Sequence, residues 1–268
     1  MHPLITSPQN PKIKNLLSLE KARERRDQNV FVIEGLKELS LALAGGYTIQ
    51  SIYFSPSIIS AEELLELVHK ENLLIPVQQS VFEKIAYRES TGGIIAVAEQ
   101  KKHELAQIRL GKNPLILVLE SVEKPGNLGA VLRTADAAGV DAVIICDPQT
   151  DFYNPNVVRS SVGCVFTTAL ASATSEETIS WLKKNEVNIY CTYLKASKEY
   201  YKIDFTRASA IVMGTEATGL SDLWVENADA NIIIPMAGKI DSMNVSTAAA
   251  VVVFESVRQR TNLLPSKV

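Results

Sequence analysis

From residue 115 onwards, short apolar runs alternate with stretches of helical periodicity, and the runs are apolar at almost every position. A strand with one face in water alternates apolar and polar residues, whereas a strand of a parallel sheet has helices on both faces and is apolar throughout. The second half of the chain is therefore predicted to be an α/β domain built on a parallel sheet. The expected strands are 115–120, 142–146, 166–169, 189–192, 210–213 and 232–234. The expected helices are 129–139, 176–185 and a last one that ends at Arg260, and 156–163 is expected to be a helix or a turn.

The first 100 residues show a second alternating pattern, which predicts a smaller α/β domain. One polar helix is expected within residues 4–30, with its start signal at 7–11. Residues 101–113 are polar and carry no strand signal, so they are predicted to be a linker to a domain over 114–268. The expected strands of the first domain are 31–33, 51–54, 74–77 and 93–98, and the expected helices are 35–45 and 61–71.

The net charge of the 268-residue chain is −3, which gives no overall signature of nucleic-acid binding. Residues 12–26 are locally basic, however, with six Lys or Arg against two Glu. Such a stretch is either a solvated helix face or a surface that contacts phosphates. The candidate RNA contacts in it are Lys14, Arg23, Arg25 and Arg26.

The three cysteines are widely spaced in apolar sequence, which predicts buried, reduced thiols. The three histidines lie far apart, so no metal site is expected. The apolar runs are much shorter than the ~20 residues that cross a membrane, and the first residues do not follow the pattern of a signal peptide. We therefore expect a cytoplasmic protein with no membrane partner.

Three loops of the second domain share one design: each follows an expected strand and combines glycine with polar residues. They are 121–129, which leads to Arg133, then 214–221 and 235–247. Ligands of parallel α/β sheets bind at the carboxyl ends of the strands, so these loops define a candidate site. A dinucleotide site is disfavoured, because Gly126 and Gly129 are three residues apart and do not follow the G-x-G-x-x-G spacing.

Each polar residue in the loops has a structural interpretation and a functional one. Asn127, Asn244 and Ser246 are suited to capping helices or to contacting a ligand. Arg133 lies in an apolar helix turn and needs an anion, which is either a carboxylate or a phosphate. Glu216 either caps a turn or serves the site, and Gly214 allows close approach to the backbone.

Together the three loops resemble the three signature motifs of the SpoU family of RNA ribose 2′-O-methyltransferases, within the knotted methyltransferase superfamily. The resemblance covers about residues 114–260, and the segment 159–163 also matches. Two positions depart from the family pattern: Ala217 replaces a glycine and Met243 replaces a leucine. The matching residues are Asn127, Gly129 and Arg133 in the first motif, Gly214, Glu216, Gly219, Leu220 and Ser221 in the second, and Pro235, Met236, Ser242, Asn244, Val245 and Ser246 in the third.

The resemblance implies a deep C-terminal trefoil knot, S-adenosylmethionine as cofactor and a homodimer that completes the site. By position, the implied cofactor contacts are Gly214, Ile234 and Met243, with Thr192 and Leu194 as weaker additions. Residues 1–100 are similar to the substrate-binding domain of many members, which is related to a ribosomal-protein fold.

The implied reaction transfers a methyl group to a ribose 2′-hydroxyl of RNA, with ribosomal RNA favoured over transfer RNA. The implied catalytic residues are Arg133, Asn127, Glu216, Asn244 and Ser246. Because guanidinium is a poor base, we expect Arg133 to hold a phosphate rather than to remove the proton. The alternatives are a transfer-RNA ribose methyltransferase and a non-catalytic RNA-binding assembly protein with the same fold.

Overall fold

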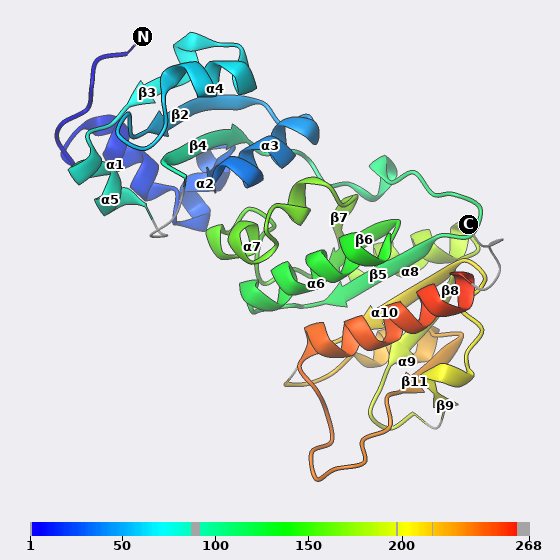
Figure 1. Ribbon diagram of the computed structural model, residues 1–268. Helices are drawn as coiled ribbons and strands as arrows, with labels where there is room; N and C mark the ends of the chain where they lie inside the picture. Colours follow the sequence, from blue (N-terminus) through cyan, green and yellow to red (C-terminus); the bar gives the residue numbers. More distant parts are fainter. Residues whose placement is uncertain (1, 87–91, 197, 216, 262–268) are drawn as a thin grey trace. The chain divides into compact units, whose positions relative to one another are not determined.

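The structure is a computed structural model, and it describes residues 2–86, 92–196, 198–215 and 217–261. The chain forms two compact units (Figure 1). The smaller unit consists of the residues up to Lys102 together with Asp151–Thr167, and the larger unit consists of His103–Thr150 and the residues from Thr168 onwards. Within the described ranges, no helix is long and apolar enough to cross a membrane.

The larger unit is built on a parallel sheet, as the apolar strands predict. Within the described residues the sheet has seven strands in the order β7-β6-β5-β10-β8-β11-β9, and all six pairings are parallel. The strands are β5 (Leu115–Glu120), β6 (Ala142–Cys146), β7 (Leu170–Ala173), β8 (Asn188–Thr192), β9 (Lys198–Glu199), β10 (Ser209–Met213) and β11 (Ala230–Ile233). The helices are η2 (Leu105–Gln107), α6 (Pro125–Ala138), α8 (Ser175–Lys184), η4 (Tyr200–Lys202), α9 (Asp222–Asn227) and α10 (Val245–Thr261).

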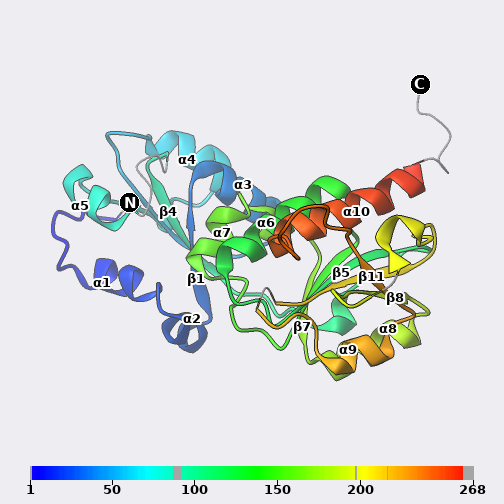
Figure 2. The same cartoon turned by 90° about the horizontal axis from the view of Figure 1, so that it is seen from below.

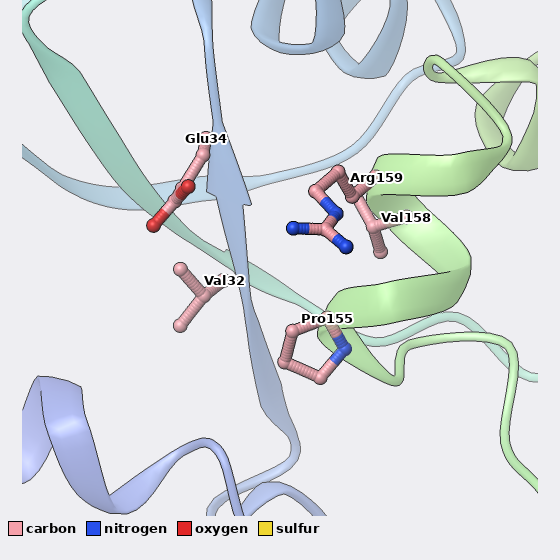
Figure 3. A pocket seen from close by; sticks show the side chains of 5 residues that line it. All are labelled: Val32, Glu34, Pro155, Val158 and Arg159. Carbon is pink, nitrogen blue, oxygen red and sulfur yellow. The ribbon is translucent and has the colours of Figure 1, made fainter. Parts of the chain in front are cut away.

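Helices cover both faces of this sheet, which explains why its strands are apolar at successive positions. Figure 2 shows α6 and α10 side by side on one face, with α8 and α9 on the other. Ile116 and Val118 of β5 belong to a buried cluster that includes Trp224 of α9. The residues between them, Leu117 and Leu119, are also fully buried. Alternate residues of one strand thus contribute to two separate cores.

The smaller unit holds a mixed four-stranded sheet in the order β1-β4-β2-β3, among the residues described. Strand β4 is antiparallel to β1 and β2, and β2 is parallel to β3. Its strands are β1 (Val30–Glu34), β2 (Ile49–Phe54), β3 (Leu74–Pro76) and β4 (Ile94–Glu99). Its helical segments are α1 (Pro11–Ser18), α2 (Ala22–Gln28), α3 (Leu36–Ala44), α4 (Ala61–Val68), η1 (Glu71–Leu73), α5 (Gln79–Ile85), α7 (Pro155–Ser160) and η3 (Cys164–Phe166).

The single helix expected within residues 4–30 is wrong, because the structure has α1 and α2 with a turn between them. Asn10 caps α1 by accepting a hydrogen bond from the Lys12 amide at 2.9 Å. At the turn, the Arg25 guanidinium donates to the carbonyl oxygens of Leu19 at 2.8 Å and Glu20 at 2.7 Å. A buried side chain therefore satisfies the carbonyls at the end of α1 that the broken helix leaves open.

The strand expected at 166–169 is also wrong: Phe166 is the last residue of the 3₁₀ turn η3, and β7 begins only at Leu170. The Phe166 ring instead packs against two aromatic rings of the smaller unit, with centroids 5.8 Å from Phe31 and 5.1 Å from Tyr47. Tertiary packing outweighs the β-propensity of this stretch. The short strand β9 and helix α9 were not expected from the sequence.

Residues 151–167 were expected to lie in the domain over 114–268, but they belong to the smaller unit. Asp151 pairs with Arg25, with 2.7 Å between Oδ2 and Nη2. The Tyr153 ring stacks on Phe31 at 4.2 Å, and its hydroxyl oxygen lies 3.3 Å from that of Tyr47. The chain thus leaves the parallel-sheet unit after Thr150 and completes the core of the other unit before it returns.

We expect Arg25→Ala to destabilise the smaller unit strongly. The Arg25 side chain is 1% exposed, and its loss leaves two backbone carbonyls and a carboxylate without their donor. Asp151 is 40% exposed and can be hydrated, so the main cost is that of the carbonyls left without a donor, about 1–3 kcal/mol. The matched control is Arg23→Ala, because Arg23 is 82% exposed and its pair with Asp27 contributes at most about 1 kcal/mol. Urea denaturation of both variants checks this, and equal midpoints would contradict it.

Candidate ligand site at the carboxyl edge of the parallel sheet

The larger unit has a cavity of about 710 Å³ where its strands end. Because all strands of the sheet are parallel, the segments that follow β8, β10 and β11 emerge at the same edge. These three segments form the walls. The cavity residues are Thr192, Tyr193, Leu194 and Lys195 after β8, then Met213–Thr215, Ala217–Leu220 and Asp222 after β10, and Ile232–Ile234, Met236, Asp241–Val245 and Ala248 around the last loop.

The loop after β10 is held closed by its own backbone. Thr215 and Gly219 exchange two amide-to-carbonyl hydrogen bonds, at 3.2 and 3.1 Å. A Cβ atom on Gly214 would collide with the backbone of Gly219 and Leu220, so only glycine permits this crossing. Gly219 itself has φ of +71°, which is also suited to glycine. The structure therefore explains why the second motif has glycine at these two positions.

Glu120 anchors the far end of the same loop. This carboxylate is buried at the end of β5 and accepts hydrogen bonds from the amide and the hydroxyl of Ser221, at 2.8 and 2.6 Å. Ser221 is the residue before α9, so the bonds fix where the loop ends and the helix begins. No sequence signal distinguishes Glu120 beyond its place at a strand end.

The first and third motifs meet through one hydrogen bond. The Asn244 side chain accepts from the Ser246 amide at 3.0 Å and from the Ser246 hydroxyl at 2.6 Å, which caps α10. Its Nδ2 donates to Oδ1 of Asn127 at 3.1 Å. Because α6 and α10 pack side by side, Asn127 and Asn244 come together although 117 residues separate them. Asn244 therefore caps α10, one of its two expected roles, and it also links the first and third motifs, which was not expected.

Arg133 lies on α6 with an exposed side chain, and it is not among the cavity residues. In the described part of the chain, no carboxylate forms an ion pair with it. The interpretation of Arg133 as a structural salt bridge is thus not supported. Its charge remains available to an external anion.

The remaining expected site residues fall into three groups. The five expected cofactor contacts, Thr192, Leu194, Gly214, Ile234 and Met243, all line the one cavity. Ser246 lies beside it and contacts Asn244. Glu216 lies outside the described residues.

One of the four basic residues expected to contact RNA is buried. Lys14, Arg23 and Arg26 are exposed, whereas Arg25 is buried and bonded to Asp151. Arg25 is therefore wrong as an RNA contact. In a helix with three arginines within four positions, the one that faces the core cannot be identified from charge alone.

Burial removes the cysteines of the larger unit from consideration as nucleophiles. It raises the pKa of Cys146 and of Cys191 to about 12. A thiol with such a pKa is almost entirely protonated at neutral pH, and only the thiolate is reactive.

The chemistry of the cavity fits a nucleoside with a charged amino-acid tail. Its volume lies within the range of about 300–1,000 Å³ that is usual for such sites. Ile234, Leu220 and Met243 offer an apolar wall for a base, whereas Lys195 and Asp222 offer charges of both signs. S-adenosylmethionine combines a purine with carboxylate, ammonium and sulfonium groups, so the residues present suit it.

A doubly covered parallel sheet, with a cavity between glycine- and asparagine-bearing loops at its carboxyl edge, defines an α/β domain that binds a nucleotide-like ligand. Residues 114–254 match the SpoU rRNA Methylase family, and residues 10–96 match the MRM3-like substrate binding domain. The chain belongs to the SpoU rRNA methylase family.

Similar proteins agree with this assignment. The chain is 30% identical to the 23S rRNA (guanosine(2553)-2′-O)-methyltransferase RlmP of Bacillus subtilis, over 93% of this chain and 97% of that protein. It is 29% identical to the 23S rRNA (uridine(2479)-2′-O)-methyltransferase of Streptomyces viridochromogenes, over 90% and 87%. The crystal structure of the AdoMet-bound rRNA methyltransferase from Sinorhizobium meliloti superposes with a TM-score of 0.88 at 31% identity, over 98% and 99%.

These findings confirm the expected family, the α/β fold with its parallel sheet, the methyltransferase class and S-adenosylmethionine as the cofactor. The chain is therefore an S-adenosylmethionine-dependent methyltransferase.

We expect Gly214→Ala to lower the melting temperature and weaken S-adenosylmethionine binding, because the added methyl group forces the loop open. Overpacking of this kind costs about 1–3 kcal/mol. The matched control is Gly126→Ala at the start of α6, where a Cβ atom meets no described atom within 4 Å. That change is expected to be neutral or to stabilise by up to about 1 kcal/mol. Thermal unfolding and calorimetric titration test the pair, and a Gly214→Ala protein with wild-type values in both would contradict the expectation.

Proposed function

We propose that this enzyme methylates a ribose 2′-hydroxyl in ribosomal RNA. The observation that carries the proposal is the Asn244–Asn127 hydrogen bond, which joins the first and third motifs at the edge of the cavity. Ribosomal RNA is favoured over transfer RNA because the similar proteins from B. subtilis and S. viridochromogenes act on 23S rRNA. The match of residues 10–96 to a substrate-binding domain also supports RNA recognition by the smaller unit.

The cofactor is proposed to lie against Thr192, Leu194, Gly214, Ile234 and Met243, the five expected contacts that line the cavity. When bound, it supplies an electrophilic methyl group for transfer to the ribose oxygen. The closed loop after β10 fixes the wall on one side, and the Asn244 cap fixes the other. Such positioning accounts for a large part of the catalysis of a transfer reaction.

Arg133 is proposed to bind a phosphate of the RNA next to the reacting ribose. Its guanidinium is always charged at neutral pH and is suited to bidentate contact with phosphate. It is exposed, and its charge is not neutralised by any carboxylate that the structure describes. We assign the removal of the hydroxyl proton to the substrate's own phosphate rather than to Arg133. Asn127, Glu216, Asn244 and Ser246 are proposed to orient the nucleotide and the loops.

We further propose a cytoplasmic homodimer and a trefoil knot in the larger unit. The dimer is supported by the outward faces of α6 and α10, which carry Arg133 together with Val251, Val257 and the 47% exposed ring of Phe254. A second copy on these helices would bring Arg133 to a cavity that it does not line in its own chain. The knot rests on the family and on the strand order, in which β10 lies between β5 and β8 while β11 lies beyond β8.

We expect Arg133→Ala to lower kcat at least about 100-fold, the scale seen when a preorganised charge is lost. Because Arg133 is exposed, the melting temperature and S-adenosylmethionine binding should remain close to wild type. Arg109→Ala is the matched control, since Arg109 is also exposed and lies outside the cavity. Methyl transfer to a 23S rRNA transcript, measured with labelled cofactor, checks this. Near-normal turnover by Arg133→Ala would remove the assigned role, and absent cofactor binding by the wild type would favour the non-catalytic alternative.

Neutralising Lys14, Arg23 and Arg26 to Gln should weaken RNA binding in a salt-dependent way. Each lost phosphate contact lowers the slope of log Kd against log salt by about 0.7–0.9. The Arg23–Asp27 pair does not compete strongly, because both side chains are exposed. Binding of a 23S rRNA transcript at several salt concentrations measures the slope. An unchanged slope would assign these residues to a solvated face.

A further inference from the structure

The chain after β8 carries basic and aromatic residues between the cavity and the edge strand of the sheet. Among them, only Lys195 has been considered so far. Lys195 lines the cavity, whereas Lys198 lies in β9, the last strand in the sheet order. Tyr201 follows in the 3₁₀ turn η4. We call Lys195, Lys198 and Tyr201 the edge-strand surface.

The charges of this surface are available to a ligand. Among the described residues, neither Lys195 nor Lys198 has an ion-pair partner. The neighbouring Lys202 differs, because it pairs with Glu199 at 2.9 Å and lowers the pKa of that carboxyl. The surface therefore presents two unpaired positive charges next to the cavity.

The tyrosine ring is both exposed and held in place. Tyr201 is 50% exposed, and it meets Tyr200 edge to face at 78°, so the two rings do not stack on each other. The chain beyond it is tied to α10, since Gln259 accepts from the Phe205 amide at 2.8 Å and donates to the Ile203 carbonyl at 2.9 Å. An exposed aromatic ring on an anchored turn loses little conformational entropy when a base stacks on it.

We propose that the edge-strand surface binds single-stranded nucleotides of the substrate RNA next to the methylated one, with a base stacked on Tyr201 and a phosphate held by Lys198. Exposed aromatic rings combined with unpaired basic side chains are typical of proteins that bind unstacked RNA. A second copy of the chain is a poorer occupant, because a symmetric contact would bring together two copies of the same basic surface. The inference rests on the proposed function and deepens it.

The test measures binding of a 23S rRNA transcript by the full-length protein. Tyr201→Ala should weaken binding about tenfold, and Tyr201→Phe should restore it because stacking needs only the ring. Lys198→Gln should lower the salt slope by about 0.7. Lys184→Gln is the matched control: Lys184 is also exposed but ends α8 and lies outside the cavity, so no change is expected.

Calorimetry with S-adenosylmethionine separates this inference from the proposed function. Tyr201 does not line the cavity, so Tyr201→Ala should bind the cofactor normally. If the wild type binds the cofactor but not the RNA, the proposed substrate is wrong. If the wild type binds both and Tyr201→Ala is unaffected, the edge-strand surface is wrong while the proposed function stands. A change in oligomeric mass for Tyr201→Ala, measured by light scattering, would also overturn the inference, because it would place this surface between copies.

Discussion

The parallel direction of every strand in the larger sheet is the constraint on which the site depends. It brings the carboxyl ends of β8, β10 and β11 to one edge, so that loops far apart in sequence share a cavity. Direction alone does not give the loops a shape. That shape comes from three local devices: the close crossing that Gly214 permits, the Glu120 carboxylate that holds Ser221, and the hydrogen bond from Asn244 to Asn127. Each of these three contacts joins two segments of the chain in one defined geometry. Together they preorganise the cavity.

The sequence predicted most of the larger sheet because burial on both faces leaves a strong signal. Strands such as Ala142–Cys146 and Ser209–Met213 are apolar at nearly every position, and no other common architecture requires this. Phe166 shows where the signal fails. Its neighbours favour a strand, yet its ring packs on Phe31 and Tyr47, more than 100 residues away in the chain. A partner at that distance leaves no trace in local composition, so the course of residues 151–167 could not be predicted.

The site residues also divide into those that local sequence predicts and those that only the fold brings together. Gly214 and Asn244 were recognised because their roles are set by the backbone, through a close crossing and a helix cap, and these depend on residue type at fixed spacing. Glu120 was missed because a single carboxylate at a strand end has no distinctive spacing. Its partner Ser221 lies 101 residues later, and only the fold brings them within 2.6 Å.

Arg25 and Arg133 show how one residue type acquires opposite roles from its surroundings. Each lies on a helix, Arg25 on α2 and Arg133 on α6, and each requires an anion. At Arg25 the protein supplies it, with Asp151 and two carbonyls around a guanidinium that is 1% exposed, so the charge contributes to folding. At Arg133 no described carboxylate is supplied, and the charge stays in solvent on the same helix that carries Asn127. An uncompensated charge on an exposed helix face costs the folded state little while it is hydrated. In the proposed role, Arg133 stabilises a bound phosphate only once RNA displaces that water, so its interaction energy contributes to the complex rather than to the fold.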